Sequence, residues 1–126
     1  MQYLPEAAEY CDKETFEANC ASNQVVIIKD AKYGRMRAGR CIDGKGEMHC
    51  HHDTTQLLHG ICSGRQKCQI EVTDIGKKSA PCPKDYTSYL EADYKCEDCK
   101  YCNLIGFVLN PNCFNVHLFK LDPCIA

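Results

Sequence analysis

The chain has 126 residues, which is the length of one ordinary domain. Its formal net charge of −2 does not indicate a nucleic-acid partner, because proteins that bind nucleic acids usually carry a basic surface. The sequence has no apolar run long enough for a transmembrane helix, so we expect none.

Cysteine is the most informative residue type, with 12 copies in the chain. Such a share is typical of short secreted chains stapled by disulfides, and the even count permits complete pairing. Tryptophan is absent, so the aromatic core is thin, and bridges worth about 2–4 kcal/mol each would compensate. We therefore expect an extracellular, secreted protein. Residues 1–20 lack the basic start and apolar middle of a signal peptide, which suggests a mature or trimmed form.

The first elements are expected to be strands and a loop. Residues 1–10 predict an irregular lead-in, and residues 16–20 alternate weakly between apolar and polar side chains. Residues 25–28 are all β-branched and apolar, which predicts a buried strand. Residues 36–53 are rich in Gly, Arg, His and Asp and predict a long loop, which cysteines at 41 and 50 would pin.

A short helix is predicted next. Asp53 or Thr54 can cap it, and Gly64 ends it. The spacing places four apolar side chains on one helical face: Leu57, Leu58, Ile61 and Cys62. Residues 68–72 alternate and predict a strand.

The rest of the chain divides into a loop, a strand and a different C-terminal part. Residues 73–87 predict a second long loop, and residues 89–96 a strand. Long loops without regular structure are unusual in compact domains, but cysteines can hold them. Residues 97–126 contain two apolar runs around an Asn-Pro-Asn turn, which suggests a hairpin, and no glycosylation sequon occurs in the chain.

Two motifs carry a resemblance to a known family. The segment AKYGR at 31–35 is similar to ANYGR, and APCPKDYTSYLEADYKC at 80–96 is similar to DPCxGTYKYLEVxYxC. Both patterns, with a short helix between them, resemble the sea-urchin-egg-lectin (SUEL) type, or rhamnose-binding, lectin family over residues 9–96. The resemblance implies a small disulfide-rich α/β domain with antiparallel strands, one or two short helices and long structured loops. Residues 97–126 would be a cysteine-rich C-terminal extension packed on it.

The resemblance also implies a disulfide pattern. Eight cysteines match the family order, although eight cysteines alone would permit 105 pairings. The implied bridges are Cys11–Cys41, Cys20–Cys96, Cys50–Cys82 and Cys62–Cys68. Two further bridges are expected within the C-terminal extension, among Cys99, Cys102, Cys113 and Cys124.

The candidate sugar site follows from the same resemblance. Carboxylates and lysines recognise neighbouring hydroxyls, and an aromatic ring supports the apolar face of a sugar. Tyr33 stands at the tyrosine of the family motif, and Asp12 stands where the family has Glu. The alternative interpretations are a tyrosine that packs the strand and an exposed acid beside a bridge. For Arg35 we favour a structural role.

The second motif departs from the family. Ala80 stands in place of an Asp, Lys84 in place of a Gly, and Thr87 or Ser88 in place of a Lys. Losing a carboxylate and a charged donor would remove roughly 1.5–3 kcal/mol each. The rhamnose/galactose site is therefore eroded, although Lys84 and Asp85 could rebuild a site of different specificity.

Metal-binding, redox and hydrolase alternatives have little support in the sequence. The spacing Cys96-x-x-Cys99-x-x-Cys102 and the cluster from His49 to Asp53 resemble metal ligands, but the implied bridges already use Cys96 and Cys50. The Cys99-x-x-Cys102 pair lacks the helix that a redox motif needs. No serine elbow is present, and we expect neither catalysis nor a cofactor.

The strongest rival is an extracellular module that recognises protein rather than sugar, as in adhesion receptors with the same fold. A secreted effector is a further possibility. Our prediction is a secreted lectin-like module that binds a cell-surface glycan, with an extracellular protein as the alternative partner. A homo-oligomer would strengthen weak single-site binding.

Overall fold

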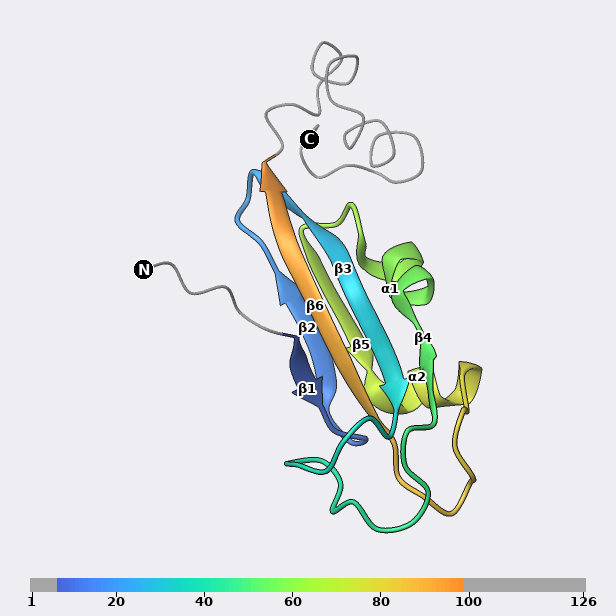
Figure 1. The fold of residues 1–126 in the computed structure, drawn as a ribbon. Coiled ribbons are helices and arrows are strands. Elements are labelled where there is room, and N and C mark those ends of the chain that lie inside the picture. Colours follow the sequence, from blue (N-terminus) through green and yellow to red (C-terminus); the bar gives the residue numbers. More distant parts are fainter. Residues whose placement is uncertain (1–6, 99–126) are drawn as a thin grey trace.

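Figure 1 presents a computed structural model of the chain, which describes residues 7–98. In these residues no helix is long and apolar enough to cross a membrane. The described part contains six strands and two short helices: β1 (Ala8–Tyr10), β2 (Thr15–Asn19), β3 (Gln24–Gly34), β4 (His51–Asp53), α1 (Thr55–Cys62), β5 (Lys67–Glu71), α2 (Val72–Lys78) and β6 (Tyr89–Asp98).

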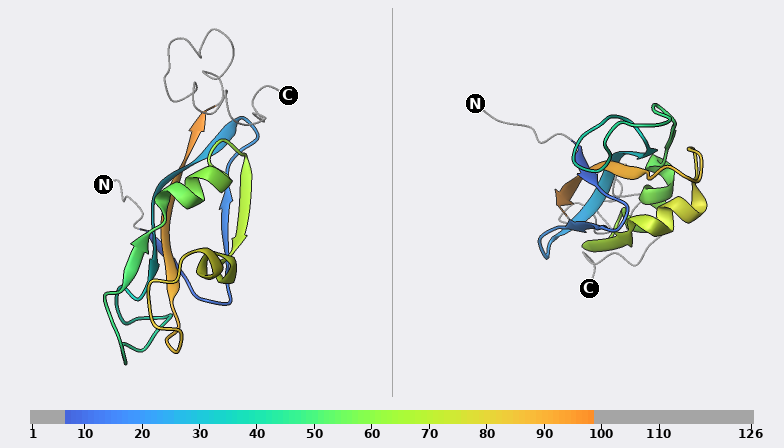
Figure 2. Two further views of the ribbon diagram at one scale, coloured as in Figure 1. Left: turned by 90° about the vertical axis from the view of Figure 1, so that its right-hand side faces the viewer. Right: turned by 90° about the horizontal axis from the view of Figure 1, so that it is seen from below.

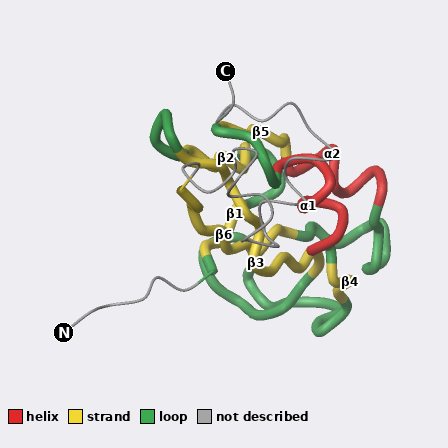
Figure 3. Tube along the Cα trace, turned by 90° about the horizontal axis from the view of Figure 1, so that it is seen from above, coloured by secondary structure: helices red, strands yellow, loops and turns green. Residues whose placement is uncertain are grey.

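The strands form two antiparallel sheets. One has the order β1-β6-β3-β4, and the other pairs β2 with β5. The long strands β3 and β6 pair from Gln24↔Asp98 to Gly34↔Tyr89, with a bulge between Ile28 and Asp30. Both helices lie on the same side of these long strands (Figure 3). The result is the small disulfide-rich α/β fold that the resemblance implied.

The core lies between the two sheets and beneath α1. Strands β2 and β5 contribute alternate side chains, as expected for strands with one buried face, whereas the exposed β4 contributes none. From β2, Phe16 is fully buried and meets Tyr10 and Tyr94 edge-to-face at centroid distances of 5.0 and 6.2 Å. The β-branched run predicted at 25–28 forms part of β3, where Val25 and Val26 are fully buried.

The predicted helix is present as α1. Leu58 and Cys62 are buried on the predicted face. Of the two predicted caps, Asp53 supplies the contact, because its Oδ1 accepts a hydrogen bond from the Thr55 backbone N–H at 2.9 Å. Hydrogen bonds with Thr55 lower the pKa of the Asp53 carboxyl. Thr54 occupies the N-cap position without a side-chain cap bond.

Three short elements correct the predicted loops. Helix α2 occupies the start of the loop predicted at 73–87, β4 the end of the loop predicted at 36–53, and β1 part of the lead-in. The strand predicted at 68–72 ends at Glu71, and Val72 begins α2 instead. These elements have only three to seven residues. They are stabilised by pairing and packing against the rest of the fold, so their own sequence carries little signal.

Four disulfides connect the described residues: Cys11–Cys41, Cys20–Cys96, Cys50–Cys82 and Cys62–Cys68. They are the four pairs that the resemblance implied. The bridges expected among the last four cysteines fall outside the described residues. Strand β6 runs to Asp98 and so extends two residues past the domain boundary predicted at 96.

Candidate functional site

The antiparallel topology gathers three loops at one end of the main sheet. Because Gly34 pairs with Tyr89, the loop that leaves β3 and the loop that enters β6 begin side by side. The segment after β1 joins them, since Tyr10 pairs with Leu90. Figure 1 shows the two long loops together at the lower end of the molecule, and Figure 2 shows them again from the side and from below.

This end of the sheet carries a cleft of about 420 Å³, here called the Tyr33 cleft. Its lining includes all four residues predicted to contact sugar, namely Asp12, Tyr33, Lys84 and Asp85. They come from the segment after β1, from the end of β3 and from the loop before β6. A volume of this size is within the usual range of small-ligand sites, about 300–1,000 Å³.

Tyr33 is held in the cleft wall by the core. Only 5% of the residue is exposed, so its ring offers no open face to a sugar. Gly76 of α2 permits this position, because a Cβ there would lie 2.6 Å from the Tyr33 hydroxyl oxygen. Burial and the nearby charge of Asp12 raise the pKa of the Tyr33 phenol, against a hydrogen bond with Ser88 that lowers it.

Of the charged side chains that line the cleft, Lys77 forms an ion pair with Asp74 of α2, whereas three others are not used by the fold. Within the described residues Asp12, Lys84 and Asp85 form no ion pair or hydrogen bond through their side chains. Lys84 and Asp85 are exposed, and Asp12 is half-buried. Ala80 also lines the cleft, so the position where the family has a carboxylate presents only a methyl group. The cleft thus combines the carboxylates of Asp12 and Asp85, the ammonium groups of Lys77 and Lys84, and the phenols of Tyr33 and Tyr86.

Arg35 ties the two long loops together. It is 3% exposed, and its guanidinium donates to the backbone carbonyls of Glu47 at 2.6 Å, Lys45 at 2.5 Å and Thr87 at 2.5 Å. Glu47 and Lys45 belong to the loop after β3, whereas Thr87 precedes β6. The contacts agree with the structural role that the sequence favoured.

A small second core anchors the loop after β3. Met36, Ile42 and Tyr89 are buried together there. The Tyr89 hydroxyl donates to the Arg37 carbonyl at 3.1 Å and accepts from the Arg37 backbone N–H at 3.0 Å. Arg37 also forms an ion pair with the buried Glu91. The loop is therefore ordered by packing and hydrogen bonds as well as by cysteines.

Glu14 and Arg40 form an ion pair that joins the segment after β1 to the loop after β3. Arg40 donates to both Glu14 carboxylate oxygens, at 2.7 and 3.0 Å, beside the Cys11–Cys41 bridge. The bond from Arg40, followed by one from the Cys11 backbone N–H, lowers the pKa of Glu14 from 4.5 to about 2.

The Glu14 contact predicts a specific pH dependence. A carboxyl with a lowered folded-state pKa stabilises the fold above its unfolded pKa, and the contribution disappears as pH falls through the folded value. We expect the stability difference between wild type and Glu14→Gln to be constant above pH 5, to shrink below 4.5 and to vanish near 2. Urea unfolding across this range measures it, with Glu17→Gln as the control. A difference that grows on acidification would contradict the assignment.

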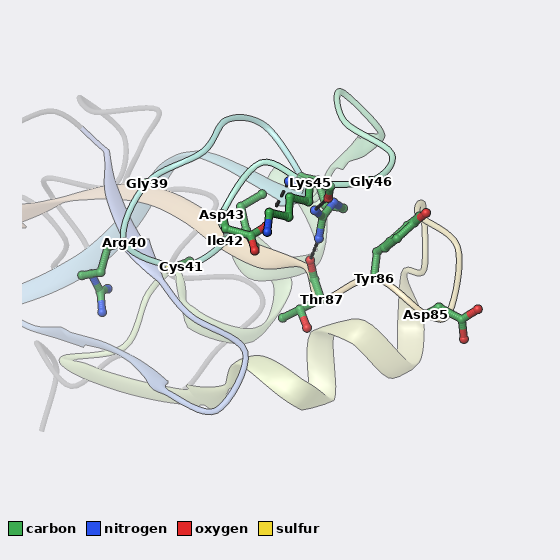
Figure 4. A pocket seen from close by; sticks show the side chains of 11 residues that line it. Gly39, Arg40, Cys41, Ile42, Asp43, Lys45, Gly46, Asp85, Tyr86 and Thr87 are labelled. Carbon is green, nitrogen blue, oxygen red and sulfur yellow. Dashed lines mark hydrogen bonds between the residues drawn. The ribbon is translucent and has the colours of Figure 1, made fainter.

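A second cleft, of about 620 Å³, adjoins the first (Figure 4). It is lined by the loop after β3, including Arg40, Asp43 and Lys45, and it shares Asp85, Tyr86 and Thr87 with the Tyr33 cleft. The sequence alone does not identify Tyr86 as a site residue. An aromatic residue inside a polar loop was the available signal, but no periodicity identifies its exposure.

The residues considered as metal ligands have other contacts. Cys50 and Cys96 are in disulfides. His52 Nδ1 lies 2.7 Å from Ser79 Oγ. Between residues 7 and 98, no three His, Cys, Asp or Glu side chains are grouped so that they could hold a metal ion. The Cys99-x-x-Cys102 pair falls outside the described residues.

Comparison with known families gives a match over most of the described residues. A family model described as the D-galactoside/L-rhamnose binding SUEL lectin domain matches residues 18–96. The match covers β2 to β6 and therefore both long loops, while Asp12 precedes it.

Proposed function

Because the chain belongs to the D-galactoside/L-rhamnose binding SUEL lectin family, we propose that it is an extracellular lectin whose Tyr33 cleft binds one sugar of the galactose or rhamnose type. Carbohydrate binding is the activity of that family and involves no catalysis. The four disulfides are consistent with an extracellular location.

The observation that carries the proposal is the set of uncommitted polar groups in one cleft. A carboxylate accepts hydrogen bonds from two adjacent hydroxyls, and an ammonium group donates up to three. Asp12 and Asp85 supply the first kind of contact and Lys84 the second. The Tyr33 phenol can donate one more. These donors and acceptors can pair with the hydroxyl groups of a sugar.

The binding of a single sugar should nevertheless be weak. The cleft lacks a carboxylate at Ala80, and a hydrogen bond to a charged group contributes about 1.5–3 kcal/mol. A loss of 1.4 kcal/mol weakens binding about tenfold. Tight binding of a glycan would then need several linked sites, which a homo-oligomer would provide through multivalency.

Chemical-shift titration of the protein with methyl β-galactoside and with L-rhamnose tests the proposal. We expect saturable shifts at residues around the Tyr33 cleft for at least one sugar. Asp12→Asn should weaken that binding at least about tenfold, because the amide keeps only one acceptor oxygen. Gly76→Ala should also weaken it, since the added Cβ displaces the Tyr33 hydroxyl.

Glu17→Gln is the matched control, because this carboxylate lies on β2 and contacts only Gln69. It should leave the titration unchanged. If neither sugar produces saturable shifts in the folded protein, the proposed lectin activity is wrong.

A protein-recognition module is the second candidate function. It is favoured by the missing carboxylate at Ala80 and by the exposed ring of Tyr86. Capture of an extracellular partner that free galactose and rhamnose do not displace would support this candidate. Displacement by either sugar would support the lectin.

A further inference from the structure

Two adjoining clefts share one wall at the end of the main sheet. Asp85, Tyr86 and Thr87 line both the Tyr33 cleft and the larger cleft beside it. The combined surface is longer than one sugar requires, and the larger part lies outside the four residues assigned to sugar binding above. A ligand that begins in the Tyr33 cleft would leave it across Tyr86.

Tyr86 has the properties of a platform for a sugar ring. It is the only exposed large hydrophobic side chain among residues 7–98, with 39% of its surface accessible. The ring is supported from within the protein, because the Arg35 guanidinium lies over it at 5.1 Å from the centroid. Gly46 packs so closely that a Cβ there would lie 2.4 Å from the ring. A supported aromatic ring with accessible surface is suited to the apolar face of a pyranose.

The larger cleft presents an exposed cation to a ligand. Arg35 is buried in its wall and is solvated by carbonyl oxygens alone, so no carboxylate compensates its charge. Lys45 is exposed, and its ammonium group forms no ion pair within the described residues. Arg40 is already neutralised by Glu14. Lys45 is therefore the accessible cation of this cleft, with the buried charge of Arg35 behind it, and it can attract an anionic substituent.

The lining of this cleft also includes two acids, Asp43 and Asp85. The Asp43 carboxylate is engaged by the Lys45 backbone N–H at 2.9 Å. Figure 4 shows the Asp85 carboxylate on the far side of Tyr86 from Lys45. Lys45 therefore lies where a negatively charged substituent on the ligand would meet a cation.

We propose that the two clefts form one surface for an acidic oligosaccharide, with a neutral sugar in the Tyr33 cleft, the chain crossing Tyr86, and a uronic acid beside Lys45. The inference rests on the proposed function and adds to it the class of ligand. It also accounts for an eroded single-sugar site, because contacts outside the Tyr33 cleft would supply the affinity that the cleft lacks.

A matched pair of tetrasaccharides tests the proposal by calorimetry at low salt. The first alternates L-rhamnose with D-galacturonic acid, and the second is the same molecule with its carboxyl groups reduced, which makes it neutral. We expect the acidic form to bind at least about tenfold more tightly, and the difference to fall as salt screens the charge. Tyr86→Ala should weaken both tetrasaccharides more than it weakens methyl rhamnoside.

Lys45→Gln isolates the charge contribution, because the Lys45 side chain makes no contact that the fold needs. It should remove most of the preference for the acidic form while leaving methyl rhamnoside unchanged. Lys67→Gln, on β5 and away from both clefts, should preserve the preference.

The outcomes separate the two proposals. If methyl rhamnoside binds but the two tetrasaccharides bind equally, or Lys45→Gln leaves their ratio unchanged, the acidic ligand is refuted and the single-sugar site stands. If no saccharide binds to the folded protein, both proposals fail together.

Discussion

Replacing Arg35 by alanine is expected to destabilise the protein by at least about 3 kcal/mol and to abolish sugar binding. Three backbone carbonyls would lose a charged donor in a region where Arg35 itself is 3% exposed. Hydrogen bonds to charged groups contribute about 1.5–3 kcal/mol each, and buried acceptors left without partners add a cost. Denaturant unfolding measures the stability, and sugar titration at a temperature where the variant stays folded measures the site.

The effect on binding follows from the position of the three acceptors. Two belong to the loop after β3, and Thr87 belongs to the loop that carries Lys84 and Asp85. Without Arg35 these loops lose their common anchor, and the cleft walls lose their relative position.

Two variants sharpen this test of Arg35. Arg35→Lys should recover little, because a single ammonium group cannot reproduce the planar fork of a guanidinium that bonds three carbonyls. Arg65→Ala removes an exposed arginine of similar size and should change neither stability nor binding by a measurable amount. Normal stability of Arg35→Ala would show that the three carbonyls do not depend on it.

The parts of the fold that could be predicted are those with a strong local pattern. The β-branched run at 25–28 can bury itself only in a central strand, and it lies in β3. The apolar spacing of Leu58 and Cys62 matches one helical face, and both are buried in α1. The disulfide pattern was available only through the family resemblance, since cysteine count alone leaves many pairings open.

Other elements could not be predicted because tertiary contacts, not propensity, stabilise them. Helix α2 has seven residues, too few to show a helical period, and its two buried side chains, Val72 and Ile75, fit a loop equally well. Strand β4 is His-His-Asp and is fully exposed, so only its pairing with the end of β3 makes it a strand.

The same limit applies to the candidate site. The motif marked Tyr33 as a contact residue, but the orientation of a strand side chain depends on register, and Tyr33 proves to be largely buried. Tyr86 lies in the loop before β6. Its ring packs against Arg35 and Gly46, which belong to the segment after β3. The sequence therefore identified the residues that meet at one end of the sheet more readily than it identified the roles of the two tyrosines.

Removing the Cys50–Cys82 bridge with paired serine substitutions is expected to abolish sugar binding and to cost roughly 4 kcal/mol of stability. The bridge spans 32 residues of sequence and joins the two long loops directly. In the unfolded chain it restricts conformational freedom, and in the folded protein it holds the loop of Lys84 and Asp85 against the end of the loop after β3. We therefore expect a lower free energy of unfolding and a loss of sugar binding.

Removing Cys20–Cys96 in the same way gives the decisive comparison. This bridge spans 76 residues, so chain entropy predicts a somewhat larger loss of stability. Yet Cys20 follows β2, and Cys96 pairs with Val26 near the opposite end of the sheet from Gly34↔Tyr89. At a temperature where both variants are folded, the Cys20–Cys96 variant should bind sugar normally while the Cys50–Cys82 variant should not. Equal loss of binding in the two would mean that the bridges act on the site only through overall stability, and that the junction of the two loops has no separate role in positioning it.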